Sequence, residues 1–415
     1  MTPARARPSV RVTRKLKRES DIEGRYQFTI VTTIVKTGHA GAIGLLMTLA
    51  VATPARAALT EGPRLAAIYD SILQARFDQA EQRLKQACPP APVEACQALA
   101  TVAIWWQILL DPESRHLDAR LEKAAATAIA GAEAWTRREP GRAEAWFYLA
   151  GAYAPLVQWR VLRAERLAAA REGKKIKDAL ERALALDPTL QDAYFGIGLY
   201  HYYADVAPAA LKILRWLLLL PGGDRVKGLQ EMLQARDRGE LLRSEADYQL
   251  HWLYLWYEQK PDVALALLRG LDARYPSNPI FLQRIAEVQH EYFHDHRGAA
   301  ATWETLLARA RAAQVGAARI AEVRARLGLA AELIETSQPD RAIGHLTAVI
   351  ELRPTAPHSA LALAHLLLGE AHDRLGRRDL ATAAYQAALA LAPERDPASV
   401  RARARAGLRH AARVE

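Results

Sequence analysis

The chain has 415 residues, of which 51% are hydrophobic and 25% are charged, and its formal net charge at pH 7 is +10. This length suits either more than one ordinary domain or a single array of repeats. Residues 1–57 contain ten Lys or Arg and three Asp or Glu, so most of the excess positive charge lies there. The remainder lacks the basic stripe of a phosphate-binding surface, and we therefore expect no nucleic-acid partner.

Residues 1–57 have the pattern of an export signal. The apolar run Gly41–Ala52 has the length of a signal-peptide core, and Ala55–Ala57 supplies the small residues that signal peptidase reads. We predict cleavage before Ala58 and a periplasmic or otherwise exported protein of a bacterial envelope. The alternative is an uncleaved leader that anchors the chain in the inner membrane. Residues 1–30 are long and polar for such a leader, which a later translation start would explain.

The two cysteines, Cys88 and Cys96, flank a Pro-rich turn between two predicted helices. An oxidising compartment would join them in a disulfide, and closing so small a loop would stabilise the fold by about 2–3 kcal/mol. The alternative is a pair of free thiols. Two thiols with no nearby His do not complete a metal site, and we predict no cofactor for this chain.

From residue 60 onward, apolar side chains recur at helical spacing, and strand patterns are nearly absent. Residues 60–88 read as a first helical pair. The second pair begins near Cys96 and ends with an Ala-rich helix from about Ser114 to Arg137. The third pair closes on Pro188, later than a regular repeat would, so we expect one or both of its helices to be unusually long.

The next pair is interrupted by the Leu-rich run Ala209–Leu220, which Pro208 and Pro221 bracket. The run is too short to span a membrane. We interpret it as a helix buried between layers, and the alternative is contact with a membrane or an apolar ligand.

A special turn is predicted at Gly222, Gly223, Asp224 and Arg225. Two glycines permit positive φ and close backbone approach, and Asp224 is placed to cap a helix that begins at Arg225. The structural interpretation is a tight, capped turn in which Arg225 pairs with an acid. The functional alternative is an anion or partner site at the helix N-terminus.

Aromatic residues concentrate on both sides of this turn and could either pack between helices or line a groove. They are Tyr200, Tyr202, Tyr203, Trp252, Tyr254, Trp256 and Tyr257.

The segment His290–His294 satisfies the HExxH pattern, in which two His on one helix face hold zinc and the Glu activates water. Asp295 and His296 add further candidate ligands. The motif falls where a helix is predicted to run out into a turn, so we interpret His290, Glu291 and His294 as ordinary helix-end residues. A zinc site through His290 and His294 is the weaker alternative.

Two units near the C-terminus carry small residues at regular spacing and each closes on a Pro. One contains Leu327-Gly328 and ends at Pro354, and the other contains Leu368-Gly369 and ends at Pro393. The pattern resembles the tetratricopeptide (TPR) repeat of about 34 residues. Such units stack because none can bury its apolar face alone. The resemblance implies an all-α, right-handed TPR-like solenoid over residues 58–415, irregular in its centre and capped by a polar helix at Ser399–Arg413.

Residues 190–285 also resemble the central region of the TPR-containing inclusion-body clearance proteins and their bacterial relatives. The similarity rests on Tyr194–Tyr203, on the apolar run followed by the Gly-Asp-Arg turn, and on Ala246–Tyr257. The resemblance implies an all-helical solenoid, a lipid- or aggregate-related role in the eukaryotic members, and no catalytic residues.

The sequence therefore predicts a non-catalytic, exported scaffold that presents a groove to a protein, a peptide or an apolar ligand. Two alternatives stay open. One is a membrane-associated lipid-handling protein with peripheral membrane contact, and the other is a zinc hydrolase that uses the HExxH segment.

Overall fold

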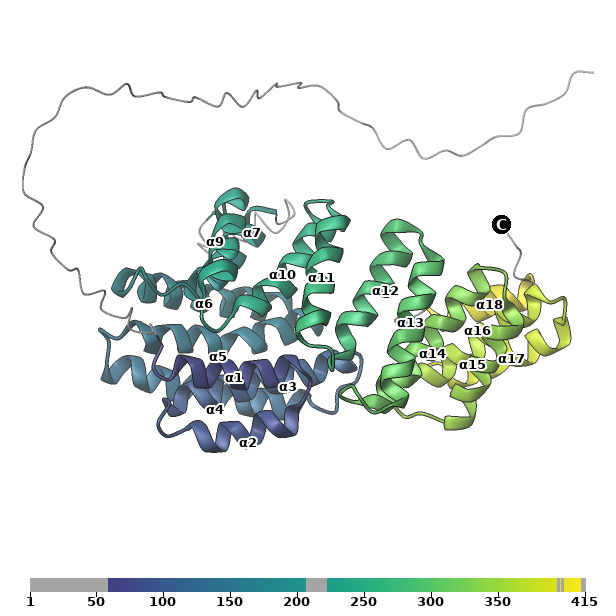
Figure 1. Cartoon of the computed structure of the whole chain (residues 1–415), viewed down its shortest axis with the longest axis horizontal. Helices are drawn as coiled ribbons and strands as arrows, with labels where there is room; N and C mark the ends of the chain where they lie inside the picture. The colour runs from purple at the N-terminus through teal and green to yellow at the C-terminus, as the bar shows by residue number, and fades with distance from the viewer. Residues whose placement is uncertain (1–58, 207–221, 394–395, 397–398, 412–415) are drawn as a thin grey trace, which may run out of the picture. The chain divides into compact units, whose positions relative to one another are not determined.

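The computed structural model describes residues 59–206, 222–393, 396 and 399–411. These residues form seventeen α-helices and no strand, which confirms the all-α prediction (Figure 1). The predicted leader and the Leu-rich run lie outside the described residues. The helices are α1 Gly62–Leu73, α2 Phe77–Ala87, α3 Val93–Leu110, α4 Asp118–Arg138, α5 Ala143–Leu162, α6 Arg166–Leu186, α7 Ala193–Val206, α9 Arg225–Arg238, α10 Arg243–Trp256, α11 Pro261–Arg274, α12 Pro279–Phe293, α13 His296–Arg311, α14 Ala318–Glu335, α15 Pro339–Leu352, α16 Ala360–Arg374, α17 Arg378–Leu391 and α18 Val400–Arg409.

Consecutive helices pack against each other along the chain, as a TPR-like repeat requires. The glycines of the repeat pattern lie where two helices cross. Gly328 of α14 faces the indole of Trp303 so closely that a methyl group would overlap it, and a methyl group on Gly369 would lie 2.5 Å from the ring of Tyr385. The small residues are therefore needed because a large aromatic side chain of the neighbouring helix occupies the space.

Helices α5 and α6 have 20 and 21 residues, which confirms the expected long helices of the third pair. The last described helix, α18, lies within the predicted capping helix Ser399–Arg413, whose last two residues are outside the described residues. A disulfide joins Cys88, the residue that ends α2, to Cys96 in the first turns of α3.

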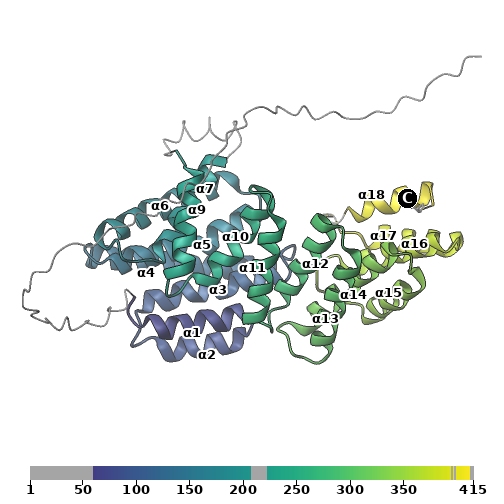
Figure 2. The same ribbon diagram turned by 45° about the horizontal axis from the view of Figure 1, so that its top comes forward.

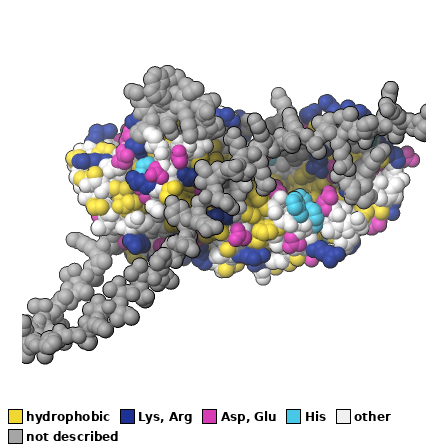
Figure 3. All heavy atoms as spheres, turned by 90° about the horizontal axis from the view of Figure 1, so that it is seen from above, with side chains coloured by type: hydrophobic (Ala, Val, Ile, Leu, Met, Phe, Trp, Pro, Cys, Tyr) yellow, Lys and Arg dark blue, Asp and Glu magenta, His cyan; other side chains and the backbone are white. Residues whose placement is uncertain are grey.

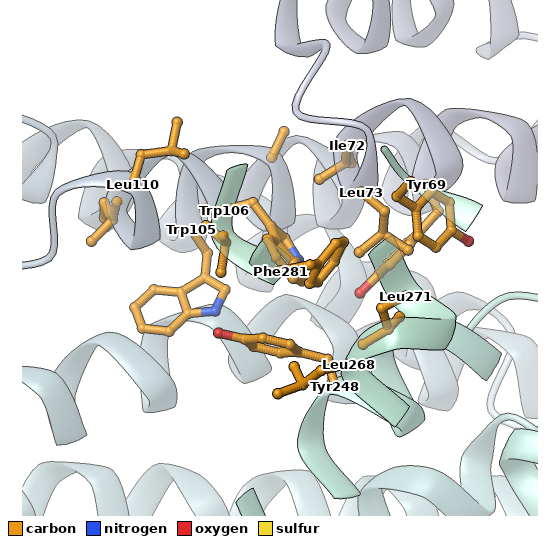
Figure 4. Packing of buried hydrophobic residues seen from close by; sticks show 14 of the residues in the cluster. Tyr69, Ile72, Leu73, Trp105, Trp106, Leu110, Tyr248, Leu268, Leu271 and Phe281 are labelled. Carbon is orange, nitrogen blue, oxygen red and sulfur yellow. The ribbon is translucent and has the colours of Figure 1, made fainter. Parts of the chain in front are cut away.

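The core also joins helices that are far apart in the sequence. The indole of Trp106 in α3 lies 4.9 Å from the ring of Tyr248 in α10 and 6.0 Å from the ring of Phe281 in α12 (Figure 4). The Tyr69 hydroxyl donates a 2.9 Å hydrogen bond to the Glu245 carboxylate. In Figure 2, α1 and α3, the helices that carry Tyr69 and Trp106, lie next to each other. These contacts depart from an ideal solenoid, in which each repeat touches only its neighbours.

Helix α3 is the one described helix long and apolar enough to cross a membrane. Its 18-residue apolar window is 67% buried inside the protein, so the core accounts for its composition.

A smaller apolar cluster closes the C-terminal end of the described helices. Its central side chain is Tyr385, which is fully buried between α16, α17 and α18 and donates a 2.9 Å hydrogen bond to the Asp373 carboxylate. A methyl group on Gly407 of α18 would also overlap the Tyr385 ring. This cluster is therefore built from three successive helices, α16 to α18.

Candidate functional site at the ends of α10, α12 and α13

The turn predicted at Gly222–Arg225 holds α9 against α7. Asp224 caps α9, because its carboxylate accepts a 2.9 Å hydrogen bond from the backbone N–H of Lys227. Gly223 does not have the positive φ that the sequence suggested. Glycine is required there for another reason, since a Cβ would overlap the backbone of His201 and Asp205 in α7.

The Arg225 side chain is engaged within the fold. Its Nε donates a 2.8 Å hydrogen bond to Glu258, and this bond holds the pKa of the Glu258 carboxyl below its usual range. The Tyr202 hydroxyl donates to the same carboxylate at 2.6 Å. Because Glu258 already neutralises Arg225, the geometry favours the structural interpretation of this turn over an anion site.

The predicted aromatic cluster divides into a buried and an exposed part. Tyr202 and Tyr254 are buried between helices, whereas Tyr203, Trp256 and Tyr257 are exposed. Two further exposed aromatic residues lie at the end of α12. We call the exposed set the aromatic surface, and it comprises Tyr203, Trp256, Tyr257, Tyr292 and Phe293.

Contacts join two pairs of residues within the aromatic surface. The rings of Tyr203 and Tyr257 lie 5.8 Å apart. Partial burial raises the pKa of Tyr292, and a hydrogen bond with Trp256 acts in the opposite direction, so these two side chains meet. The end of α12 is thereby connected to the end of α10.

A stack of rings behind Trp256 fixes its position. The rings of Trp252 and Trp256 lie 4.3 Å apart, and the guanidinium of Arg284 lies 4.9 Å from the centre of the Trp252 ring. Glu287 accepts a hydrogen bond from Arg284 at 2.5 Å. The exposed Trp256 therefore stands on a cation–π stack whose cation has its own partner.

The structure does not arrange the HExxH segment as a zinc protease helix would. Helix α12 ends at Phe293, and His294 is an exposed residue with a left-handed backbone (φ 51°). Glu291 is exposed as well. The motif therefore does not place two His on consecutive turns of one helix, which agrees with its interpretation as a helix end.

His290 instead converges with His296 on a residue from the next repeat. The Nδ1 atom of His290 lies 2.9 Å from Glu332 Oε1, and the Nδ1 atom of His296 lies 3.0 Å from Glu332 Oε2. The carboxylate of Glu332, in α14, is 4% exposed, while the two imidazoles reach the surface. Figure 3 shows histidine side chains at more than one place on the viewed face, and the largest group lies beside hydrophobic and acidic side chains.

Sequence reasoning named His290 and His296 and missed Glu332. The three residues each offer one ligand atom, and these atoms lie within 4.8 Å of one another; His294 is not part of the group. No local spacing could have found Glu332, because it lies 42 residues after His290 and the packing of α14 brings it there.

No protein-family model matches the sequence, and no curated protein sequence matches it. Among solved structures, the chain is similar to the APC/C hetero-tetramer Cut9–Hcn1, with a TM-score of 0.40 and 13% identity over 81% of this chain and 59% of that chain. It is similar to the human IFIT1 dimer with PPP-AAAA, with a TM-score of 0.36 and 17% identity over 84% of each chain. For the TPR domain of P58(IPK), the TM-score is 0.19 and the identity 14%, over 75% of this chain and 97% of that domain.

The chain thus spans less than two thirds of the Cut9–Hcn1 chain that it matches. Similarities this weak say nothing about a ligand. The resemblance to inclusion-body clearance proteins stays a prediction, and so does the expectation that no nucleic acid binds.

Proposed function

We propose that this chain is a non-catalytic scaffold that binds a protein or peptide partner through the aromatic surface. The observation that carries the proposal is the position of the exposed aromatic side chains. In the part of the chain that the structure describes, all the large aromatic residues classed as exposed lie at the ends of α7, α10 and α12. A random scatter of exposed apolar residues would need no explanation, whereas a cluster of aromatic ones is typical of binding sites.

The energetics of such side chains support a binding role. The Trp256 side chain is 54% exposed and Phe293 is 42% exposed, so each leaves apolar area in water that a partner could cover. Covering roughly 100 Å² of such area contributes about 2.5 kcal/mol to an interface. Because the Trp252–Trp256 stack already restricts the indole, little side-chain entropy would be lost on binding. We infer a partner that presents apolar side chains.

The experiment is affinity capture from the envelope fraction of the host, with two double variants compared. Trp256→Ala with Phe293→Ala removes the centre of the aromatic surface. Leu380→Ala with Leu391→Ala is the matched control, because these residues are similarly exposed on α17, at 53% and 45%. We expect the same captured protein with the wild type and the control, and at least a ~10-fold loss with the aromatic variant. Equal capture by all three proteins would overturn the proposal.

Further measurements on the same protein test the two alternative functions. Capture of lipid vesicles in place of a protein would favour the lipid-handling alternative, whose Leu-rich run lies outside the described residues. Hydrolytic activity that disappears in Glu291→Gln would favour the zinc hydrolase. The exposed, post-helical position of His294 argues against that outcome.

We also propose that the scaffold acts outside the cytoplasm, as the leader pattern indicates. The Cys88–Cys96 disulfide agrees with an oxidising compartment. Intact-mass measurement of the protein from the envelope fraction should find Ala58 at the N-terminus. A full-length chain in the cytoplasmic fraction would contradict export.

A further inference from the structure

We propose that His290, His296 and Glu332 bind one divalent transition-metal ion of the zinc type. The residues come from three consecutive helices: the last turn of α12, the first residue of α13 and the last turn of α14. Their ligand atoms already lie within 4.8 Å of one another. Two imidazole nitrogens and one carboxylate oxygen are a donor set that Zn²⁺ takes in proteins.

The burial of Glu332 is an independent argument for a cation. Its carboxylate is 4% exposed, and among the described residues its only ion-pairing partners are the two imidazoles. A buried carboxylate without a full positive charge beside it is costly. No Lys or Arg in the described part of the chain supplies that charge to Glu332 at ion-pair distance. A divalent cation held between the three side chains would supply it.

The distances are close to those of a metal site. Zinc with bonds of about 2.0–2.1 Å in tetrahedral geometry separates its ligand atoms by roughly 3.4 Å. The Nδ1-to-oxygen distances here are 2.9 Å for His290 and 3.0 Å for His296. The imidazoles would therefore retreat from Glu332 by only a few tenths of an ångström, which side-chain rotation provides. Because both imidazoles reach the surface, the fourth position would face water.

The bound ion would tie the α12–α13 junction to α14. That junction consists of His294, with its left-handed backbone, and Asp295, whose side chain caps α13 by accepting a 2.8 Å hydrogen bond from Gly298. It follows Tyr292 and Phe293 directly. The ion would thus hold in place the end of α12 that carries part of the aromatic surface.

The test is a Zn²⁺ titration of the purified full chain after chelator treatment, followed by isothermal titration calorimetry and thermal melting. We expect one tight site per chain and a melting temperature that rises with Zn²⁺ concentration. Two variants, His296→Ala and Glu332→Gln, should each weaken Zn²⁺ binding by at least ~100-fold. Even outer-shell substitutions cost about 10–100-fold in affinity, so the loss of a ligand should cost no less.

The matched control is His294→Ala, which removes the other His of the HExxH segment and is expected to bind Zn²⁺ like the wild type. Circular dichroism of each variant tests folding, and His296→Ala changes a side chain that is one-third exposed, so it should fold even where Glu332→Gln does not. The proposal is overturned by absence of a stoichiometric site, by equal affinity in His296→Ala and the wild type, or by an equal loss in His294→Ala.

Discussion

Two regions of the described helices, α1–α12 and α16–α18, differ in how they are held together. In the region α1–α12, residues far apart in sequence meet, as Trp106 does with Tyr248 and Phe281. In the region α16–α18, the buried cluster around Tyr385 is made by consecutive helices. A repeat array whose contacts are local can unfold from one end, whereas contacts across many repeats make them unfold together. We therefore expect the helices of α1–α12 to unfold together and those of α16–α18 to unfold separately from them.

The largest expected effect is a difference in how many helices lose protection when one buried ring is removed from each region. Trp106→Ala and Tyr385→Ala each remove a fully buried ring, and each should cost about 3–5 kcal/mol locally. In Trp106→Ala, we expect loss of protection in α10 and α12 as well as α3. In Tyr385→Ala, the loss should be confined to α16–α18. Hydrogen exchange followed by mass spectrometry measures the protection of each helix in both variants. If Trp106→Ala reduced protection in α3 alone, α3 would not be coupled to α10 and α12.

The second prediction concerns the junction of α7 and α9 inside the larger region. Gly223→Val would drive a side chain into the backbone of α7 and should destabilise by about 1–3 kcal/mol. Gly222→Val is the matched control, because nothing lies within 4 Å of the position of its added Cβ, and it should change stability by less than ~0.5 kcal/mol. Denaturant titrations of the two variants compare them directly. Equal midpoints would show that α9 does not depend on this close approach.

How far the sequence could predict these features depends on whether their signal is local. Gly328 and Gly369 allowed the sequence to predict where helices cross, because only a small residue fits against Trp303 or Tyr385. The N-cap role of Asp224 could also be predicted, because Asp224 directly precedes the helix that begins at Arg225. The sequence could not predict why residue 223 is glycine. A Cβ there would overlap the backbone of α7, a separate helix, and the φ of Gly223 is not positive.

Contacts between helices far apart in the sequence could not be predicted, because they produce no local sequence pattern. The approach of α3 to α10 and α12 joins residues more than a hundred positions apart, and periodicity describes only one helix at a time. The same limit applies to Glu332, which looks like any helical glutamate until α14 packs beside α12. The HExxH pattern contains His290, which the structure places beside His296 and Glu332, but α12 ends before His294.

The third prediction uses pH to compare a buried histidine, His251, with a partly buried one, His372. Burial lowers the pKa of His251 in α10 to about 3, against an ordinary value of 6.5. The unfolded chain therefore binds a proton between these values while the folded chain does not, so stability falls as pH drops from 6.5 toward 3. The slope from this one group is up to ~1.4 kcal/mol per pH unit.

His251→Phe should remove most of that slope, as measured by denaturant titrations between pH 7 and pH 4. In the C-terminal region, partial burial also lowers the pKa of His372, which is less enclosed than His251. His372→Phe should therefore flatten the pH profile less. A larger change in His372→Phe than in His251→Phe would contradict this comparison of the two histidines.

The smallest expected effect comes from Glu291→Gln, at the exposed end of α12. Glu291 forms no ion pair within the described residues, and its side chain is exposed, so an amide should change the free energy of unfolding by less than ~0.5 kcal/mol. Glu332→Gln removes a charge on which two imidazoles converge, and it should cost more than Glu291→Gln when Zn²⁺ is present. Thermal melts with and without Zn²⁺ compare the two glutamates. Should His294→Ala abolish the Zn²⁺-dependent rise in melting temperature while Glu332→Gln keeps it, the HExxH segment itself would be the metal site, and the convergence on α14 would have no part in binding.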